Sequence, residues 1–346
     1  KIVIDSNSLK YQGQVVSAAA ATYNAVYNTD AQNLNIVYSG ATNGWIPFLD
    51  KEVAVGVEAP PTQKALFGYG SSSVSMTNLV SSSGVVATDT TGVGTGRYNL
   101  AAAGYGGDKA LFGYGESPAG RESMTNLVNN SGVVAADVSG VGTTRHGARA
   151  ATYGNDKAIF GYGSLASGYT AITNLVNNSG VVAADTTGVG TSRTILAASG
   201  YGTDKAIFGY GTTGSYTAVT NLVSNVGVAA TDTSGVGSAR IWLGATRYGG
   251  DKAIFGYGTA SSGNSSLTNL VSNNGVVSAD VTGVGTVRNG LAAARYGNDK
   301  AIFGYGAPGN LSMTNLVSNV GVVAADVTGV GTGRDSLAAA EFSYTA

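Results

Sequence analysis

The chain has 346 residues, of which 43% are apolar and 11% are charged, and its formal net charge is −1. This balance provides no electrostatic field that would attract nucleic acid or an anionic membrane, and no run of about 18 apolar residues could span a bilayer. The chain has no cysteine, which excludes disulfides, thiolate zinc sites and thiol nucleophiles.

Glycine is frequent, with 53 residues, whereas proline is scarce, with 5. Because the apolar share is near the globular average, this composition is typical of a turn-rich β protein rather than of a disordered chain. The chain starts at Lys1 without a methionine or a signal-peptide pattern. We therefore expect it to be a segment of a longer or processed polypeptide.

Residues 1–50 predict a small β unit that differs from the rest of the chain. Its segments 1–5 and 34–38 alternate apolar and polar residues as strands do, and a turn precedes Trp45. Residues 51–63 include two prolines and predict a linker. The remaining part, residues 64–346, is repetitive.

The motif KALFGYG at residues 64–70 returns five more times with small changes. Its phenylalanines follow one another at intervals of 45 to 48 residues: Phe67, Phe112, Phe160, Phe208, Phe255 and Phe303. A second constant string, close to TNLVSNxGVVAADTTGVGT-R, runs between the copies. A period near 45 residues with Gly-rich turns is the signature of four-stranded propeller blades. We therefore expect an all-β fold, a six-bladed β-propeller of four-stranded blades preceded by a small β domain.

One repeat, residues 97–142, predicts four short strands, which we name a, b, c and d in chain order. Strand a, LAAAGY, has the small side chains that suit the crowded axis of a propeller. Strand b, ALFGYG, carries aromatic side chains that suit the wider space between blades. Strand c is SMTNLV and strand d is VVAADVSGVGT, and turns rich in Gly, Asp and Asn separate the strands.

The two ends of the repeat region complement each other. The first repeat lacks strand a, because residues 60–63 lead directly into strand b. The last repeat ends in an additional strand a, residues 336–342. We expect this C-terminal strand to complete the first blade, which leaves no open sheet edge where the ring closes.

The repeats differ from one another mainly in two places. Length varies in the loop between strands b and c, and residue type varies just after a repeated arginine. Both places project from the same face of a propeller, so we expect one variable face and one uniform face. The variable face carries rings that could stack on sugars or pack against a protein, at Tyr98, His146, Tyr169, Tyr216 and Trp242. The alternative is neutral drift of solvated loops.

The repeated arginines allow two interpretations. They could clamp a carboxylate or sulfate of a ligand near the axis, or they could pair with the repeated aspartate of each strand d. The arginines are Arg97, Arg145, Arg193, Arg240, Arg288 and Arg334. The aspartates are Asp89, Asp137, Asp185, Asp232, Asp280 and Asp326. A group present in every blade is more often part of the scaffold, which favours the ion pair.

The sequence offers little for catalysis. His146 is the single histidine, so no histidine-based metal cluster or proton relay can form. The string GVGTGR lacks the Lys-Ser/Thr ending of a phosphate-binding loop. We therefore expect no enzyme, no cofactor and no metal site. The enzymatic alternative is a polysaccharide depolymerase that uses Glu116, Glu122 or Glu341.

The repeat resembles a kelch repeat in the order R…LAAA…KAIFGYG…TNLVSNxGVV, with an arginine before strand a and a Gly-rich end to strand b. The resemblance covers residues 64–346 and implies a propeller. The chain departs from the kelch pattern in two respects, because the diglycine is Gly-Tyr-Gly here and a valine replaces the tryptophan near strand d.

Residues 1–50 resemble the end of a β domain common in fibre and structural proteins of tailed bacteriophages. There, a KIxIDxNxxxxxG strand pair leads to a VYSGATNGW turn, as at residues 37–45 here. The resemblance implies a virion protein in a tail fibre or other surface appendage, extracellular and usually homotrimeric. On this basis we expect the unit to lie against its symmetry-related copies and to bury Ile2, Ile4 and Trp45.

Together these features predict a non-enzymatic virion protein whose variable face binds a host cell-surface glycan or protein. Other virion or tail proteins are expected partners, whereas nucleic acid and membrane insertion are not expected. The alternative is a purely structural spacer or a capsid decoration protein.

Overall fold

The computed structural model of the chain describes residues 63–343 and, before them, the segments 2–3, 10–11, 14–15, 26–27, 35–41 and 44–48. The chain divides into two compact units, residues 1–60 and 61–346. The described residues are all-β, and their one helical element is a 3-10 turn at Ser71–Ser73. They therefore hold no helix that could cross a membrane. The predicted linker lies outside the described residues except for Gln63, which begins a strand.

The described strands of the first unit form two small sheets. In one, β5 pairs antiparallel with β6 so that Tyr38 lies opposite Trp45, and the two rings meet edge to face with centroids 5.4 Å apart. Trp45 is partly exposed. Ile4 and the side chain of Ile2 lie outside the described part, and burial between copies stays a prediction. The strands are β1 (Ile2–Val3), β2 (Lys10–Tyr11), β3 (Gln14–Val15), β4 (Val26–Tyr27), β5 (Asn35–Tyr38) and β6 (Trp45–Phe48), with sheet orders β1-β4 and β3-β2-β6-β5.

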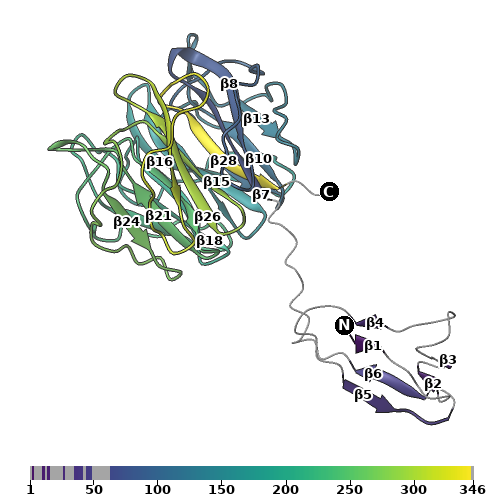
Figure 1. The fold of residues 1–346 in the computed structure, drawn as a ribbon. Helices are drawn as coiled ribbons and strands as arrows, with labels where there is room; N and C mark the ends of the chain where they lie inside the picture. Colours follow the sequence, from purple (N-terminus) through teal and green to yellow (C-terminus); the bar gives the residue numbers. More distant parts are fainter. Residues whose placement is uncertain are drawn as a thin grey trace. The chain divides into compact units, whose positions relative to one another are not determined.

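The second unit contains six three-stranded antiparallel sheets, which we number 1 to 6 along the chain (Figure 1). Each sheet has the order a-b-c. Sheet 1 is β28 (Ala338–Ser343), β7 (Gln63–Gly70) and β8 (Val74–Val80); sheet 2 is β9 (Ala101–Tyr105), β10 (Lys109–Gly113) and β13 (Thr125–Val128); sheet 3 is β14 (Arg149–Tyr153), β15 (Lys157–Leu165) and β16 (Gly168–Val176). Sheet 4 is β17 (Ala197–Tyr201), β18 (Lys205–Gly209) and β19 (Thr220–Val223); sheet 5 is β20 (Gly244–Tyr248), β21 (Lys252–Gly256) and β24 (Thr268–Val271); sheet 6 is β25 (Ala292–Tyr296), β26 (Lys300–Gly306) and β27 (Leu311–Val317). Two small ribbons, β11 (Glu116–Ser117) with β12 (Gly120–Arg121) and β22 (Thr259–Ala260) with β23 (Gly263–Asn264), extend the loops between strands b and c.

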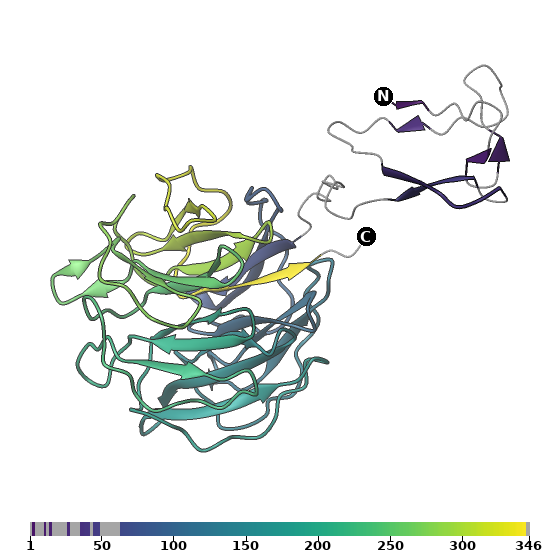
Figure 2. The ribbon, with the colours of Figure 1, turned by 90° about the horizontal axis from the view of Figure 1, so that it is seen from below.

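The C-terminal strand completes the first sheet, as the sequence predicts. β28 pairs antiparallel with β7, and Ala339 lies opposite Phe67. Figures 1 and 2 show β28, in yellow, beside the blue strand β7 from two directions.

The strands a of the six sheets contact one another in a closed cycle. β9 contacts β14, and the contacts continue through β17, β20 and β25 to β28, which contacts β9 again. Ala, Gly and Ser predominate in these strands, and their small side chains allow the close approach. The central part of the unit is therefore surrounded by all six sheets.

The predicted fourth strand of each blade is not a regular strand. In sheet 1, residues 86–90 follow β8 and join it by two isolated bridges, Val86 with Val80 and Thr90 with Thr77. Between these bridges the side-chain amide of Asn78 donates to the carbonyl of Ala87 at 3.0 Å, where a regular ladder would use backbone groups. The same asparagine stands in every repeat, so the sheets have three strands and an irregular outer segment.

The hydrophobic core lies in the contact zones between neighbouring sheets, which we call seams. Tyr114 of sheet 2 packs against Phe160 of sheet 3 with ring centroids 4.9 Å apart, and both side chains are fully buried. The preceding residue must be glycine, because a Cβ at Gly113 would lie 2.7 Å from the Phe160 ring. Burying each phenylalanine contributes roughly 1.5–3 kcal/mol. Equivalent pairs occupy every seam, including the last, where Tyr305 meets Phe67.

Candidate functional site

The six repeated arginines lie in the seams. Arg145, between sheets 2 and 3, is fully buried and stacks over the Tyr114 ring at 4.0 Å. Its Nη2 donates to Oδ1 of Asn174 at 2.6 Å, and its Nε donates to the carbonyl of Tyr162 at 2.9 Å. The guanidinium therefore binds one sheet through a ring face and the next through hydrogen bonds.

This placement corrects one of the two interpretations of the arginines. At least 98% of each side chain is buried, so these groups do not form an exposed clamp for a ligand: Arg97, Arg145, Arg193, Arg240, Arg288 and Arg334. Four of them lie 3.5 to 3.9 Å from the strand-d aspartate that follows them in the chain, which agrees with the predicted ion pairs. The arginine is identical in all six copies because it is buried in each of them.

The repeated aspartates make a second link across each seam. Asp185 accepts hydrogen bonds from the backbone N–H of Thr143 at 3.0 Å, from its hydroxyl at 2.5 Å and from Asn174 at 2.9 Å. Burial raises the pKa of Asp185, but these hydrogen bonds and the charge of Arg145 together lower it by more. The pKa of Asp185 therefore lies below the ordinary value.

The same link joins the last sheet to the first. Thr332, which follows sheet 6, donates to Asp89 of the first repeat across 243 residues of sequence.

The two variable segments of each repeat meet at one end of the second unit, which we call the variable end. In five repeats the residue after the buried arginine pairs with a residue at or beyond the end of strand b in an isolated antiparallel bridge. The pairs are Tyr98 with Glu116, His146 with Ser164, Thr194 with Thr212, Ile241 with Thr259, and Asn289 with Ala307. Length variation and residue variation therefore fall on adjacent backbone.

A closed cycle of backbone hydrogen bonds lies at the variable end. In each repeat the second residue after the buried arginine donates its N–H to the carbonyl of the equivalent residue of the preceding repeat, at 2.7 to 3.1 Å. The six residues are Asn99, Gly147, Ile195, Trp242, Gly290 and Ser336, and Asn99 donates to Ser336. The cycle uses only backbone atoms, so it leaves the six side chains free to differ.

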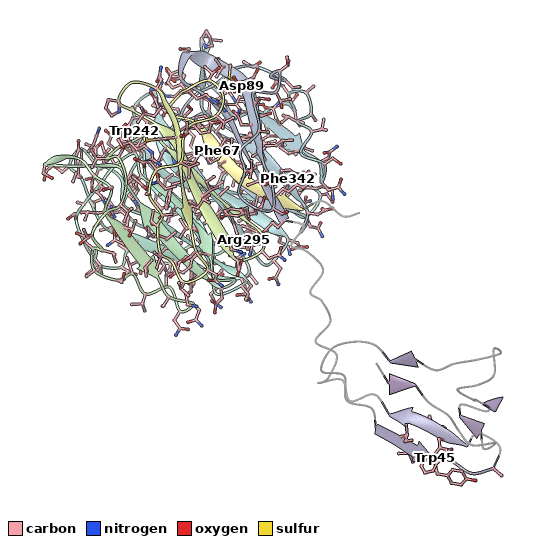
Figure 3. The ribbon with its side chains drawn as sticks, viewed as in Figure 1. Trp45, Phe67, Asp89, Trp242, Arg295 and Phe342 are labelled. Atoms are coloured by element: carbon pink, nitrogen blue, oxygen red, sulfur yellow. The ribbon has the colours of Figure 1, made fainter. Side chains whose placement is uncertain are left out.

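All six residues of this cycle have positive φ, a region that favours glycine. Gly147 and Gly290 meet that preference. Ile195 (φ 46°) and Trp242 (φ 58°) do not, and a bulky or β-branched residue costs roughly 1–2 kcal/mol there. Trp242 is partly exposed. Figure 3 shows Trp242 and Arg295 on opposite sides of the second unit.

Tyr98, Glu116 and His146 form a cluster at the variable end. Nδ1 of His146 lies 3.6 Å from Oε2 of Glu116, and the histidine side chain is 20% exposed. Burial lowers the pKa of His146 and outweighs the opposite effect of Glu116, while Arg121 and Arg149 lower it further. Burial and Glu116 also raise the pKa of Tyr98. His146 is therefore neutral at neutral pH and suits a hydrogen-bonding contact.

The two remaining predicted rings lie near the connections between strands b and c. Tyr169 is the second residue of β16 and lies opposite Ser164, and Tyr216 bridges Thr212. Each is 40% exposed. Both rings are accessible to a macromolecule.

The opposite end of the sheets, which we call the uniform end, is fixed by packing. Gly154 (φ 57°) donates to the carbonyl of Asp204 at 2.7 Å, and a Cβ there would lie 3.0 Å from the carbonyl oxygen of Asn225. A Cβ at Gly227 would lie 2.9 Å from the ring of Tyr153. The uniform sequence of these turns therefore has a structural cause and is not by itself evidence for binding elsewhere.

The acidic candidates for catalysis do not form a facing pair. Glu116 lies in β11 and Glu122 directly follows β12 of the same ribbon, and the hydroxyl of Ser117 donates to Glu122 at 2.6 Å. Glu341 belongs to β28 and lines an inner cavity with Arg247. In the described part of the chain, no group of three or more His, Cys, Asp or Glu side chains is placed to hold a metal.

The structure also reveals charged residues that the sequence analysis missed. All six strands a line a central cavity of about 50 Å³, and Arg149 is the charged residue in its wall. Arg247 and Arg295 line further cavities between the same strands. Their signal in the sequence is a departure from the small residues that predominate in strand a.

No protein-family model matches the chain, and no curated protein matches it in sequence.

Proposed function

We propose that residues 61–346 form a six-bladed β-propeller in which each sheet with its irregular outer segment is one blade. Three cyclic sets of contacts support this proposal. The strands a follow one another in a closed cycle, the aspartate links run from each sheet to the next, and the backbone hydrogen bonds of the variable end return to their start. A propeller accounts for all three with one geometry.

We further propose that the variable end binds a host cell-surface glycan or protein without catalysis. The observation that carries this proposal is the strained backbone of Trp242, whose side chain is partly exposed. Glycine serves at the equivalent position in two repeats, so the fold does not require this side chain. Strain retained at an accessible site is typical of function, and tryptophan and tyrosine are the residues that most often anchor an interface.

The resemblance of residues 1–50 to phage fibre domains supports the biological setting. We propose a virion appendage, extracellular, in which the first unit forms a homotrimer and contacts other virion proteins. Binding by the second unit would then serve host attachment.

Two substitutions test binding at the variable end. Trp242→Gly removes the ring and relieves the positive-φ strain, while Tyr98→Ala removes a neighbouring ring. We expect each to weaken binding to an array of bacterial surface glycans, or to host cells, by about 1–3 kcal/mol. We expect the melting temperature of Trp242→Gly to stay the same or to rise.

The matched control is Val133→Ser at the uniform end, where the valine is 60% exposed. This variant should bind as the unchanged protein does. Equal binding by all three variants, or equal losses in all three, would make the second unit a spacer.

Incubation with the bound glycan separates binding from hydrolysis. We expect no new reducing ends. Release of oligosaccharide that Glu116→Gln abolishes would establish a depolymerase instead.

A further inference from the structure

One repeat departs from the others at two adjacent positions where strand a begins. It has Ala148 followed by Arg149, whereas the other repeats have leucine followed by alanine or glycine: Leu100-Ala101, Leu196-Ala197, Leu243-Gly244, Leu291-Ala292 and Leu337-Ala338. A large aliphatic side chain is missing next to the place where a large cationic one is added. The two changes compensate each other in volume, which is what a packed interior tolerates.

The second of these positions has little space in sheet 5. At the equivalent Gly244, a Cβ would lie 3.2 Å from the ring of Phe303 in the next sheet. The side chain of Arg149 instead lines the central cavity, whose remaining wall is made of Leu, Ala and Gly. A cavity of about 50 Å³ has room for a few water molecules or one small ion.

Arg149 lacks a counter-charge in this cavity. Its Nη1 donates to the carbonyl of the preceding residue, Ala148, at 2.8 Å. Across residues 63–343 and the short described segments, no carboxylate forms an ion pair with it. Burial lowers the pKa of Arg149 to about 10, so the group is still charged at neutral pH. Arg149 is partly exposed, but its charge lies against an aliphatic wall without an ionic partner, which is costly to the folded state.

We propose that Arg149 and the central cavity form a binding site for a small oxyanion, a carboxylate, phosphate or sulfate group. A guanidinium offers a planar fork of donors that matches the oxygens of such a group. The aliphatic wall supplies no competing charge. The site does not depend on binding at the variable end, since none of the five aromatic residues proposed there lines the cavity.

Two sources could supply the oxyanion, a free inorganic ion or the acidic group of a sugar. Thermal unfolding distinguishes them when the protein is titrated with sodium sulfate, sodium phosphate or sodium glucuronate. Sodium chloride at matched ionic strength removes the general effect of salt. We expect at least one oxyanion to raise the melting temperature by several degrees over chloride.

Two variants assign the effect to Arg149. Arg149→Met removes the charge and keeps an extended side chain. The double variant Ala148→Leu with Arg149→Ala restores the sequence of four other repeats. Neither should show the oxyanion-specific rise, and the double variant should melt higher than the unchanged protein in chloride.

The outcomes separate clearly. A rise with sulfate or phosphate alone assigns a free ion, and a rise with glucuronate assigns an acidic sugar. No specific rise in the unchanged protein, or the same rise in both variants, would overturn the proposal.

Discussion

The seams and the variable end contain equally repetitive backbone, yet their side chains differ greatly in how they repeat. In each seam a Phe, a Tyr, an Arg, an Asn and an Asp recur with almost the same contacts, as the set around Arg145 illustrates. At the variable end the six backbone hydrogen bonds also recur, but the residues that make them include Gly147, Ile195 and Trp242.

The difference follows from which atoms do the bonding. A seam is held by buried side chains, so a substitution there removes packing or leaves a polar atom without a partner. The cycle at the variable end is held by backbone atoms, so any residue that tolerates positive φ preserves it. Substitutions should therefore change the stability of the fold little at the variable end and greatly in a seam. Measurements of stability should separate the two places.

The largest effect should come from opening one sheet and its contact with the next sheet at the same time. Deleting residues 336–346 removes β28, exposes the edge of β7 and opens the contact of the first sheet with the second. We expect loss of cooperative unfolding or aggregation, measured by circular dichroism and light scattering. A truncated chain that melts like the intact one would contradict the proposed closure.

A single seam arginine should have the next largest effect. Arg145→Met leaves Oδ1 of Asn174 and the carbonyl of Tyr162 without their donor in a buried place. We expect a loss of about 3–5 kcal/mol in the free energy of unfolding, measured with urea. Lys157→Met, at an exposed hairpin, is the control and should change the value by less than about 0.5 kcal/mol. Equal effects of the two substitutions would remove the distinction between seam and surface.

Acid should weaken the aspartate links by a smaller amount per link. Burial raises the pKa of Asp185, but its hydrogen bonds lower it more, so the folded-state pKa lies below the unfolded value of about 4. Such a carboxylate stabilises the protein above the unfolded pKa, and this contribution is lost as the pH falls through the folded pKa. The melting temperature should therefore be nearly constant above about pH 5 and fall below about pH 4. In Asp185→Asn the fall should be smaller, and an identical fall would show that this link is not responsible.

The sequence predicts most of the second unit because each signal is repeated. Strands a, b and c, the pairing of residues 338–343 with residues 63–68 and the meeting of the variable segments all follow from spacing and turn residues. The fourth strand fails because Asn78 and its equivalents bond to the backbone through their side chains. The β-propensity of a segment does not show where a side-chain amide takes the place of a backbone N–H as hydrogen-bond donor.

The site is less accessible from sequence. Aromatic residues in variable loops can be found by comparing repeats. The positive φ of Ile195 and Trp242 cannot be predicted in this way, because neither residue type favours positive φ. The arginines illustrate the opposite problem, because their repetition favours a scaffold role but does not exclude a ligand clamp. Burial decides between them. Arg149 is visible in the sequence only when strand a is compared copy by copy.

The pairing of β28 with β7 has a consequence for synthesis. During translation β7 leaves the ribosome before the five other sheets, and its partner strand is made only after them. Until then β7 presents an unpaired edge, and the link between Asp89 and Thr332 must wait across 243 residues. In a crowded assembly of nascent chains, the β28 of a neighbouring copy is chemically identical to the correct partner. Pairing of β7 with the β28 of its own chain therefore competes with pairing to the β28 of a neighbouring chain. The pairing within one chain prevails only while the nascent chains remain dilute.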